Sequence, residues 1–379
     1  MFRNTLIALL LGVLAGCGQP VSFFDAQHYP AKLSDWGIVT RSGNRLVLGQ
    51  DVDTYDLNTP LFSDYAGKLR TLWIPPGESA VFDADKTLEL PVGTILSKTF
   101  FYDQHNGQLI RSDQFSGNPA DLDLDRTLII ETRLLVHQPH GWDALPYVWD
   151  GADAVLKITG DLQTFEFKQT DSSIVLNYQV PSKNECAGCH ATDHTSGENQ
   201  PIGMKARHLN RPHPLEATNQ LDRLSQRGLI RLPAGDLPAN ARWSDAQLHV
   251  GDRDVGDWEV SDRDVAHRAR SYLDINCGHC HNPRGAADTS GLMLDIASTG
   301  PAANRRAMGV CKPPIASGGG SGGNLYSIVP GKPAQSILSY RMRTTDPADR
   351  MPEIGRTLVD AEGVAVVDAW LAGMSGECL

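Results

Sequence analysis

Two short motifs of the same form carry the residues best suited to chemistry. Each places two cysteines three positions apart with a histidine directly after the second; they comprise Cys186, Cys189 and His190 in CAGCH, and Cys277, Cys280 and His281 in CGHCH. Thiols at this spacing can both bond to the vinyl groups along one edge of a haem, and the next imidazole can reach the iron. The sequence therefore predicts two covalently attached haem c groups, with His190 and His281 as proximal iron ligands.

Other uses of paired cysteines fit less well. Zinc ribbons separate their CxxC knuckles by about 15–20 residues, far less than the distance between these motifs, and they assign no role to a histidine after each pair. Thioredoxin-like dithiols occur in a βαβ context, and no such pattern surrounds either motif.

The second motif is followed by a candidate sixth ligand for its iron. A predicted helix over 262–276 runs into CGHCH, a short helix is expected over 332–342, Met351 precedes Pro352, and a last helix is expected over 360–373. This order resembles a class I cytochrome c, in which a late methionine before proline is the distal ligand. The thioether is a soft ligand that favours Fe(II) and raises the reduction potential.

Met351 is accordingly the expected distal ligand of the second haem. Met342, on an apolar helical face, is the alternative, and Met351 would then only fill a loop. For the first haem the favoured distal ligand is Met204, in a loop flanked by glycine. The open alternatives are His194, His208, His213, a group from another domain, or an iron with only five ligands.

The N-terminus predicts export. Arg3 is followed by an apolar run and by small residues before Cys17, which is typical of a secretory signal and too short to span a bilayer. The end of this segment, LAGC, resembles the bacterial lipobox, in which the cysteine is lipidated. We therefore expect Cys17 to be lipidated; an ordinary signal with a spare cysteine is the alternative. Gly18 rather than Asp after Cys17 resembles the default for outer-membrane anchoring facing the periplasm.

Two cysteines remain, and the charge limits the partners. In an oxidising compartment Cys311 and Cys378 are expected to form a disulfide, with two free thiols as the alternative. The formal net charge of -11 argues against nucleic acid and fits a basic or neutral redox partner protein.

The chain divides by pattern into an α+β multidomain protein. Signal and lipobox occupy 1–17, and the expected units that follow are a tether (18–31), an antiparallel β-sandwich (32–180), a first haem-binding segment (181–232), a linker (233–261) and an α-helical class I cytochrome c-like haem domain (262–379). Stretches rich in β-branched and aromatic residues support the sandwich. Alternation on both sides of Gly160-Asp161 predicts a hairpin over 155–168. A helix is expected over 215–230.

Several longer stretches together resemble a known family. They include YDLNTPLFSDYA, PVGTILSKTFFY, PIGMKARHLNR, NCGHCHNPRGAADTSGL, CKPPIASGGGSGG and IVPGKPAQSILSYRM. The chain resembles diheme c-type cytochrome lipoproteins of Gram-negative bacteria, whose role is unassigned. The resemblance covers nearly everything after the tether, implies two haems, and points to a parallel β-helix protein as a partner.

These features favour an electron carrier, anchored by a lipid to the outer membrane, over a catalyst. One alternative is a diheme redox enzyme, similar to a peroxidase or an oxidase, with an open site at the first haem. Another is an interaction protein in which the β-domain docks a partner and the haems supply electrons.

Overall fold

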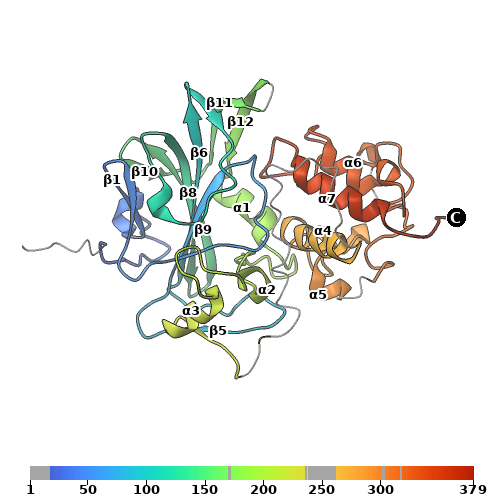
Figure 1. The fold of residues 1–379 in the computed structure, drawn as a ribbon. Helices are drawn as coiled ribbons and strands as arrows, with labels where there is room; N and C mark the ends of the chain where they lie inside the picture. The colour runs from blue at the N-terminus through green and yellow to red at the C-terminus, as the bar shows by residue number, and fades with distance from the viewer. Residues whose placement is uncertain (1–17, 170–171, 235–236, 238–261, 301–303, 316–317) are drawn as a thin grey trace, which may run out of the picture.

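The computed structural model describes most of the chain after the expected lipobox (Figure 1). Its described ranges are 18–169, 172–234, 237, 262–300, 304–315 and 318–379. The expected signal peptide, the lipidation site Cys17 and most of the expected linker (238–261) lie outside the described residues. Within these ranges, no helix is long and apolar enough to cross a bilayer.

The N-terminal half is a curled, nine-stranded sheet. Its strands are β3 (Asp53–Tyr55), β4 (Gly67–Trp73), β6 (Ile95–His105), β7 (Gln108–Ile110), β8 (Thr127–Gln138), β9 (Gly141–Asp150), β10 (Asp153–Leu156), β11 (Asp161–Lys168) and β12 (Ser173–Val180). The order is β10-β9-β8-β6-β7-β11-β12, and β4 pairs with both β6 and β3. Pairing is antiparallel except at Phe167↔Leu109, where β11 runs parallel to β7. The long strand β6 therefore lies at the centre. β8 pairs with one of its edges, and β4 and β7 pair with the first and the last part of its other edge.

The α+β class is observed, but the β part differs from the predicted antiparallel sandwich. The strands above form one curled sheet rather than two facing sheets. The hairpin predicted over 155–168 is wrong, because β10 pairs with β9 while β11 pairs with β12. Gly160 does turn the chain, with a φ of +76°. Its lack of a side chain matters there, because a Cβ would lie 2.5 Å from the Val180 carbonyl oxygen. After this turn the chain passes from β10, at one end of the strand order, to β11, next to the other end.

Residues 18–31, expected as a free tether, lie against this sheet. Val21, Phe24 and Tyr29 pack on a core that includes Trp36. The Tyr29 hydroxyl also donates a hydrogen bond to Asp143 at 2.6 Å. A small sheet of β1 (Val39–Ser42) and β2 (Arg45–Leu48) follows, with short 3-10 turns at Leu33–Trp36 and Pro119–Asp121.

Residues 181–232, the predicted first haem-binding segment, fold onto the sheet. The segment contains α1 (Lys183–His190), α2 (Ala206–Leu209) and α3 (Gln220–Gln226), and ends at β13 (Ile230–Arg231), which pairs in parallel with β5 (Ala80–Val81). Apolar residues of the segment share one core with strand residues such as Leu72 and Leu96. The helix predicted over 215–230 forms only as α3, since the Asn219 side chain accepts a hydrogen bond from Leu221 N and begins the helix there.

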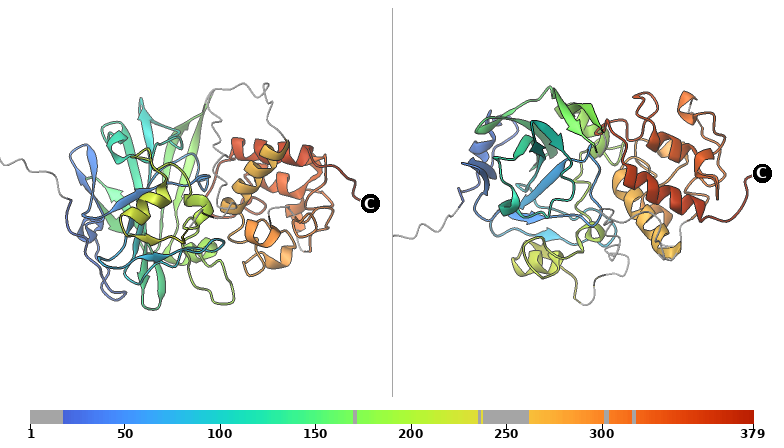
Figure 2. Two further views of the ribbon diagram at one scale, coloured as in Figure 1. Left: turned by 60° about the horizontal axis from the view of Figure 1, so that its bottom comes forward. Right: turned by 45° about the horizontal axis from the view of Figure 1, so that its top comes forward.

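The C-terminal part is helical and lies beside the sheet in every view (Figures 1 and 2). Its helices are α4 (Asp262–Asn276), α5 (Ile296–Thr299), α6 (Ile337–Arg343) and α7 (Ala361–Ala372), with 3-10 turns at Asp288–Ser290, Gly318–Ser321 and Pro333–Gln335. α4 and α7 pack together through a core that includes Leu273 and Val367. Gly363 permits this approach, because a Cβ there would lie 2.4 Å from the Tyr272 ring. A disulfide joins Cys311 and Cys378.

Candidate functional site

The first motif lies on α1, between the sheet and α4 (Figure 1). Ser182 and Glu185 form a reciprocal cap at the start of this helix: the Ser182 hydroxyl accepts from Glu185 N at 3.2 Å, and the Glu185 carboxylate accepts from Ser182 N at 2.8 Å. The helix ends at His190, so the whole motif is helical. Cys186 is buried and Cys189 is partly exposed, and both are free thiols.

Both motif histidines are oriented through the same ring nitrogen. His190 Nδ1 lies 2.8 Å from the carbonyl oxygen of Gln200, and His281 Nδ1 lies 3.0 Å from that of Leu292. Because a carbonyl only accepts, Nδ1 carries the proton, and the lone pair of Nε2 is available to a metal. Burial, with Lys98 as the next cause, lowers the pKa of His190 to about 3, and burial also lowers the pKa of His281. Both imidazoles are thus neutral, as an iron ligand must be.

A first cavity opens beside α1. It has about 1090 Å³ of free space, part of it open to solvent, and Cys186, Cys189 and His190 all line it. The cavity walls come from β4, β6, β8 and the loop that contains Met204. The two thiols and the imidazole of the first motif thus face one common cavity.

Of the expected distal candidates for the first haem, only Met204 lines this cavity together with His190. Met204 is 1% exposed. The histidine candidates are held elsewhere: His194 Nδ1 is 2.9 Å from Gly285 O, His208 Nε2 is 3.0 Å from Asp274, and His213 Nε2 is 3.0 Å from Thr54 O. None of these histidines lines the cavity.

Cationic side chains in the same cavity were missed by the sequence analysis. Arg70, Lys98 and Arg133 line it from three neighbouring strands. Arg70 is paired with Asp56 at 2.6 Å and Arg133 with Glu131, whereas Lys98 has no carboxylate partner in the part of the chain that the structure describes. Burial, followed by Arg133 and Arg70, lowers the pKa of Lys98 to about 7. A single lysine within the apolar stretch TILSKTFFY was the available signal.

The second motif begins where α4 ends. Cys277 N donates to Leu273 O and His281 N to Cys277 O, each at 2.9 Å, so helical hydrogen bonds continue into the motif. A second cavity, with about 520 Å³ of free space that is partly open to solvent, adjoins it; Cys277, Met342 and Met351 line this cavity and His281 does not. Both candidate methionines thus lie near the motif, and the lining of the cavity does not show which of them would be the iron ligand.

Arg356 holds the loop that presents Met351, a role that the sequence analysis missed. Its guanidinium donates to four backbone carbonyls, those of Met351, Leu358 and Arg341 at 3.0 Å each and that of Thr344 at 3.1 Å. Met351 N in turn donates to Arg341 O at 2.9 Å. The arginine is 4% exposed, so it acts as an internal brace for this loop.

The two motifs are in contact. Cys280 Sγ lies 3.5 Å from the carbonyl oxygen of Gly188, inside the first motif. Just beyond the motifs, His194 N donates to Arg284 O at 2.8 Å and Asn282 Nδ2 to Thr192 O at 3.2 Å. The two cavities also share wall residues, which are Leu61, Cys189, Ile354 and Gly355. Segments about ninety residues apart in sequence therefore form one site.

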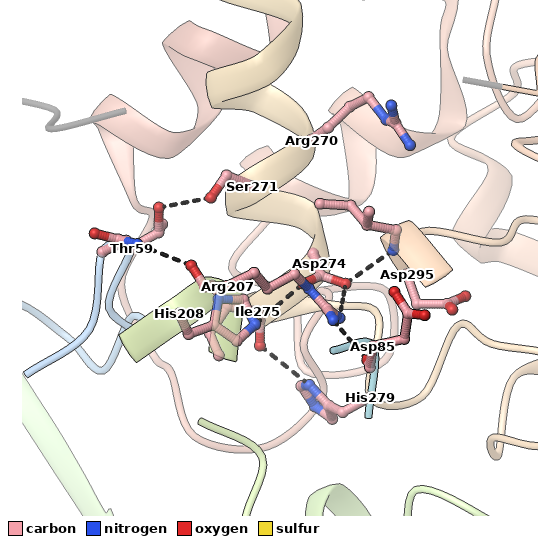
Figure 3. A network of polar contacts seen from close by, with 12 residues as sticks. Thr59, Asp85, Arg207, His208, Arg270, Ser271, Asp274, Ile275, His279 and Asp295 are labelled. Carbon is pink, nitrogen blue, oxygen red and sulfur yellow. Dashed lines mark hydrogen bonds and ion pairs between the residues drawn. The ribbon is translucent and has the colours of Figure 1, made fainter. Parts of the chain in front are cut away.

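A buried ionic network fixes the position of α2 relative to α4 (Figure 3). Arg207 binds the Asp274 carboxylate through two hydrogen bonds of 2.7 and 2.9 Å, and His208 Nε2 lies 3.0 Å from the same group. Burial alone would raise the pKa of Asp274, but Arg207 and His208 hold it well below its usual range. Thr59 and Ser271 add a hydrogen bond of 3.0 Å. Since Asp274 lies three residues before Cys277, this network anchors the end of α4 from which the second motif starts.

No protein family matches the chain, and neither a curated protein nor a solved structure is significantly similar to it. Among the described residues, no group of three or more His, Cys, Asp or Glu side chains is arranged to hold a metal ion. Haem iron needs only one or two protein ligands, since the porphyrin supplies the other four, so the motifs suffice for it.

Proposed function

We propose that this protein is a diheme c-type cytochrome, anchored by a lipid at Cys17 to the periplasmic face of the outer membrane, that relays electrons between partner proteins. The observation that carries the proposal is the contact between the two CxxCH motifs, at 3.5 Å between Cys280 Sγ and Gly188 O. Two cofactors fixed at touching motifs are neighbours, which is the arrangement that electron relay needs.

The chain's own residues would bind and orient these cofactors. Cys186 and Cys189 would form the thioether bonds of the first haem, and Cys277 and Cys280 those of the second. When bound, each haem supplies an iron that takes up and releases one electron. Hydrogen bonds at Nδ1 orient the proximal imidazoles of His190 and His281, as outer-shell carbonyls do for metal-ligating histidines generally.

The two sites differ in their distal sides. The C-terminal part would be a class I cytochrome c-like unit with Met351 as the distal ligand, held by the Arg356 brace. Met204 is the candidate for the first haem, because it shares a cavity with His190. A methionine ligand raises the reduction potential, so the second haem would be the stronger electron acceptor of the two if the first lacks one.

The test is a potentiometric titration of the full-length protein, matured with its haems and followed by visible spectroscopy. Two haems that cycle reversibly, with a shift in one potential when the other haem is removed by Cys277→Ala/Cys280→Ala, support the relay. Haems that cannot be cycled, or that both bind added ligands freely, contradict it.

A diheme redox enzyme is the second candidate, favoured by the larger first cavity and by Lys98 within it. A positively charged, partly open pocket beside an iron suits a small anionic or peroxide substrate. Peroxide turnover with an electron donor, abolished by His190→Gly and retained by Met351→Ala, would support the enzyme over the relay. Absence of turnover in the wild type would exclude it.

A further inference from the structure

A third cavity, outside the CxxCH motifs, lies between the sheet and the C-terminal helices. It has about 1270 Å³ of free space, part of it open to solvent. The loop before β4, the stretch 111–116 and the start of α7 form its walls. We call it the basic cleft after four cationic side chains in its wall, Lys68, Arg70, Arg111 and Arg211; the carboxylates of Asp56, Asp113, Asp360 and Glu362 line it as well.

Three of these cations are already neutralised by carboxylates. Arg70 and Arg211 each bind Asp56 at 2.6 Å, and Arg111 binds Asp113 at 2.8 Å and Glu362 at 2.7 Å. The remaining acid in the wall, Asp360, accepts from Gly363 N at 2.8 Å as the cap of α7. The carboxylates of the cleft are therefore committed, and none is left for Lys68.

Lys68 is the exception among the cations of the cleft. Its side chain is buried, with the residue 8% exposed, and its ammonium makes a single long hydrogen bond of 3.4 Å, to Ala66 O. Across the described residues, no carboxylate lies within ion-pair distance of it. A buried ammonium with so little compensation is costly, and an anion placed in the cleft would remove that cost.

We propose that the basic cleft binds a small oxyanion, a carboxylate or a phosphate group, with the Lys68 ammonium as its main partner. The side-chain amide of Gln114 provides a further donor within the wall. No residue of either CxxCH motif lines the cleft, although Arg70 also borders the first cavity, and Leu61, Phe62, Tyr272 and Asp360 also border the second.

Binding should weaken as the pH rises. Burial, followed by Arg70 and Lys98, lowers the pKa of Lys68 to about 7, while Asp113 and Asp360 act in the opposite direction. Lys68 is thus charged below this pH and neutral above it, so the affinity for an anion is highest in mildly acidic solution. A bound anion stabilises the charged form and must therefore raise this pKa.

The experiment measures thermal stability and binding of the full-length protein with inorganic phosphate and, separately, with succinate. Chloride at the same ionic strength is the control. Either anion should raise the Tm of the wild type and give a saturable calorimetric signal. Lys68→Met should weaken that binding at least about 10-fold, as expected when a charge-assisted hydrogen bond is lost. Lys168→Met, at an exposed lysine, is the matched control and should bind as the wild type does.

The stability of the Lys68→Met variant guards against a trivial loss of binding through misfolding. Removing an unpaired buried charge should leave its Tm in chloride equal to that of the wild type or higher. Response to one anion identifies the group that the cleft prefers, and response to both supports a general oxyanion site. The proposal is overturned if neither anion binds, or if Lys68→Met binds as tightly as the wild type.

Discussion

Replacing Asp274 tests whether the buried network holds α2 and α4 together. The Asp274 side chain is fully buried and that of Arg207 is 4% exposed. Asp274→Asn keeps the size of the side chain but removes the carboxylate charge that the buried guanidinium of Arg207 binds. Breaking a buried pair in this way costs about 3–5 kcal/mol, a large part of the roughly 5–15 kcal/mol that stabilises a typical domain.

Urea unfolding followed by circular dichroism is the assay, with Asp193→Asn as the matched control. Asp193 pairs with Arg284 at 3.3 Å and also bridges the two segments, but this arginine is exposed, so the change should leave the free energy of unfolding near that of the wild type. The folded-state pKa of Asp274 is depressed, so its contribution is complete above pH about 4 and is lost below it. The difference in the free energy of unfolding between the wild type and Asp274→Asn should therefore become smaller in acid. If Asp274→Asn and Asp193→Asn lowered the free energy of unfolding equally at neutral pH, the reasoning would be refuted.

Three further outcomes are expected. Arg356→Lys retains the charge but not the donors to four carbonyls, so it should loosen the Met351 loop, weaken the absorption band of methionine-bound ferric haem and lower the potential of the second haem; an unchanged spectrum would contradict this. Lys98→Met removes a cation from the first cavity and should lower the potential of the first haem alone in a redox titration, since a nearby positive charge favours the reduced form. Cys311→Ser opens a loop of 67 residues and should cost about 2–4 kcal/mol in urea unfolding; Cys378→Ser should give the same loss.

Local patterns predicted individual elements well. The helix expected over 262–276 coincides with α4, and Asp360 caps α7 as its position suggested. Such features depend on residues a few positions apart, which the sequence displays directly.

The pairing of strands distant in sequence could not be predicted from the sequence. Alternation around Gly160 marks two half-buried strands but says nothing of their partners, and these lie at opposite ends of the sheet. The contact between Cys280 and Gly188 needs the whole fold, as does the use of Arg356 as a brace. Lys98 and Lys68 became notable only once the curled sheet placed them in cavities.

The central claim, that each CxxCH motif attaches one haem, is tested most directly by intact-mass spectrometry of protein matured in a host with haem-attachment machinery. The wild type should carry the mass of two haems, and Cys186→Ser/Cys189→Ser and Cys277→Ser/Cys280→Ser should each carry one. A wild-type mass equal to that of the bare chain, or variants that keep both haems, would contradict it.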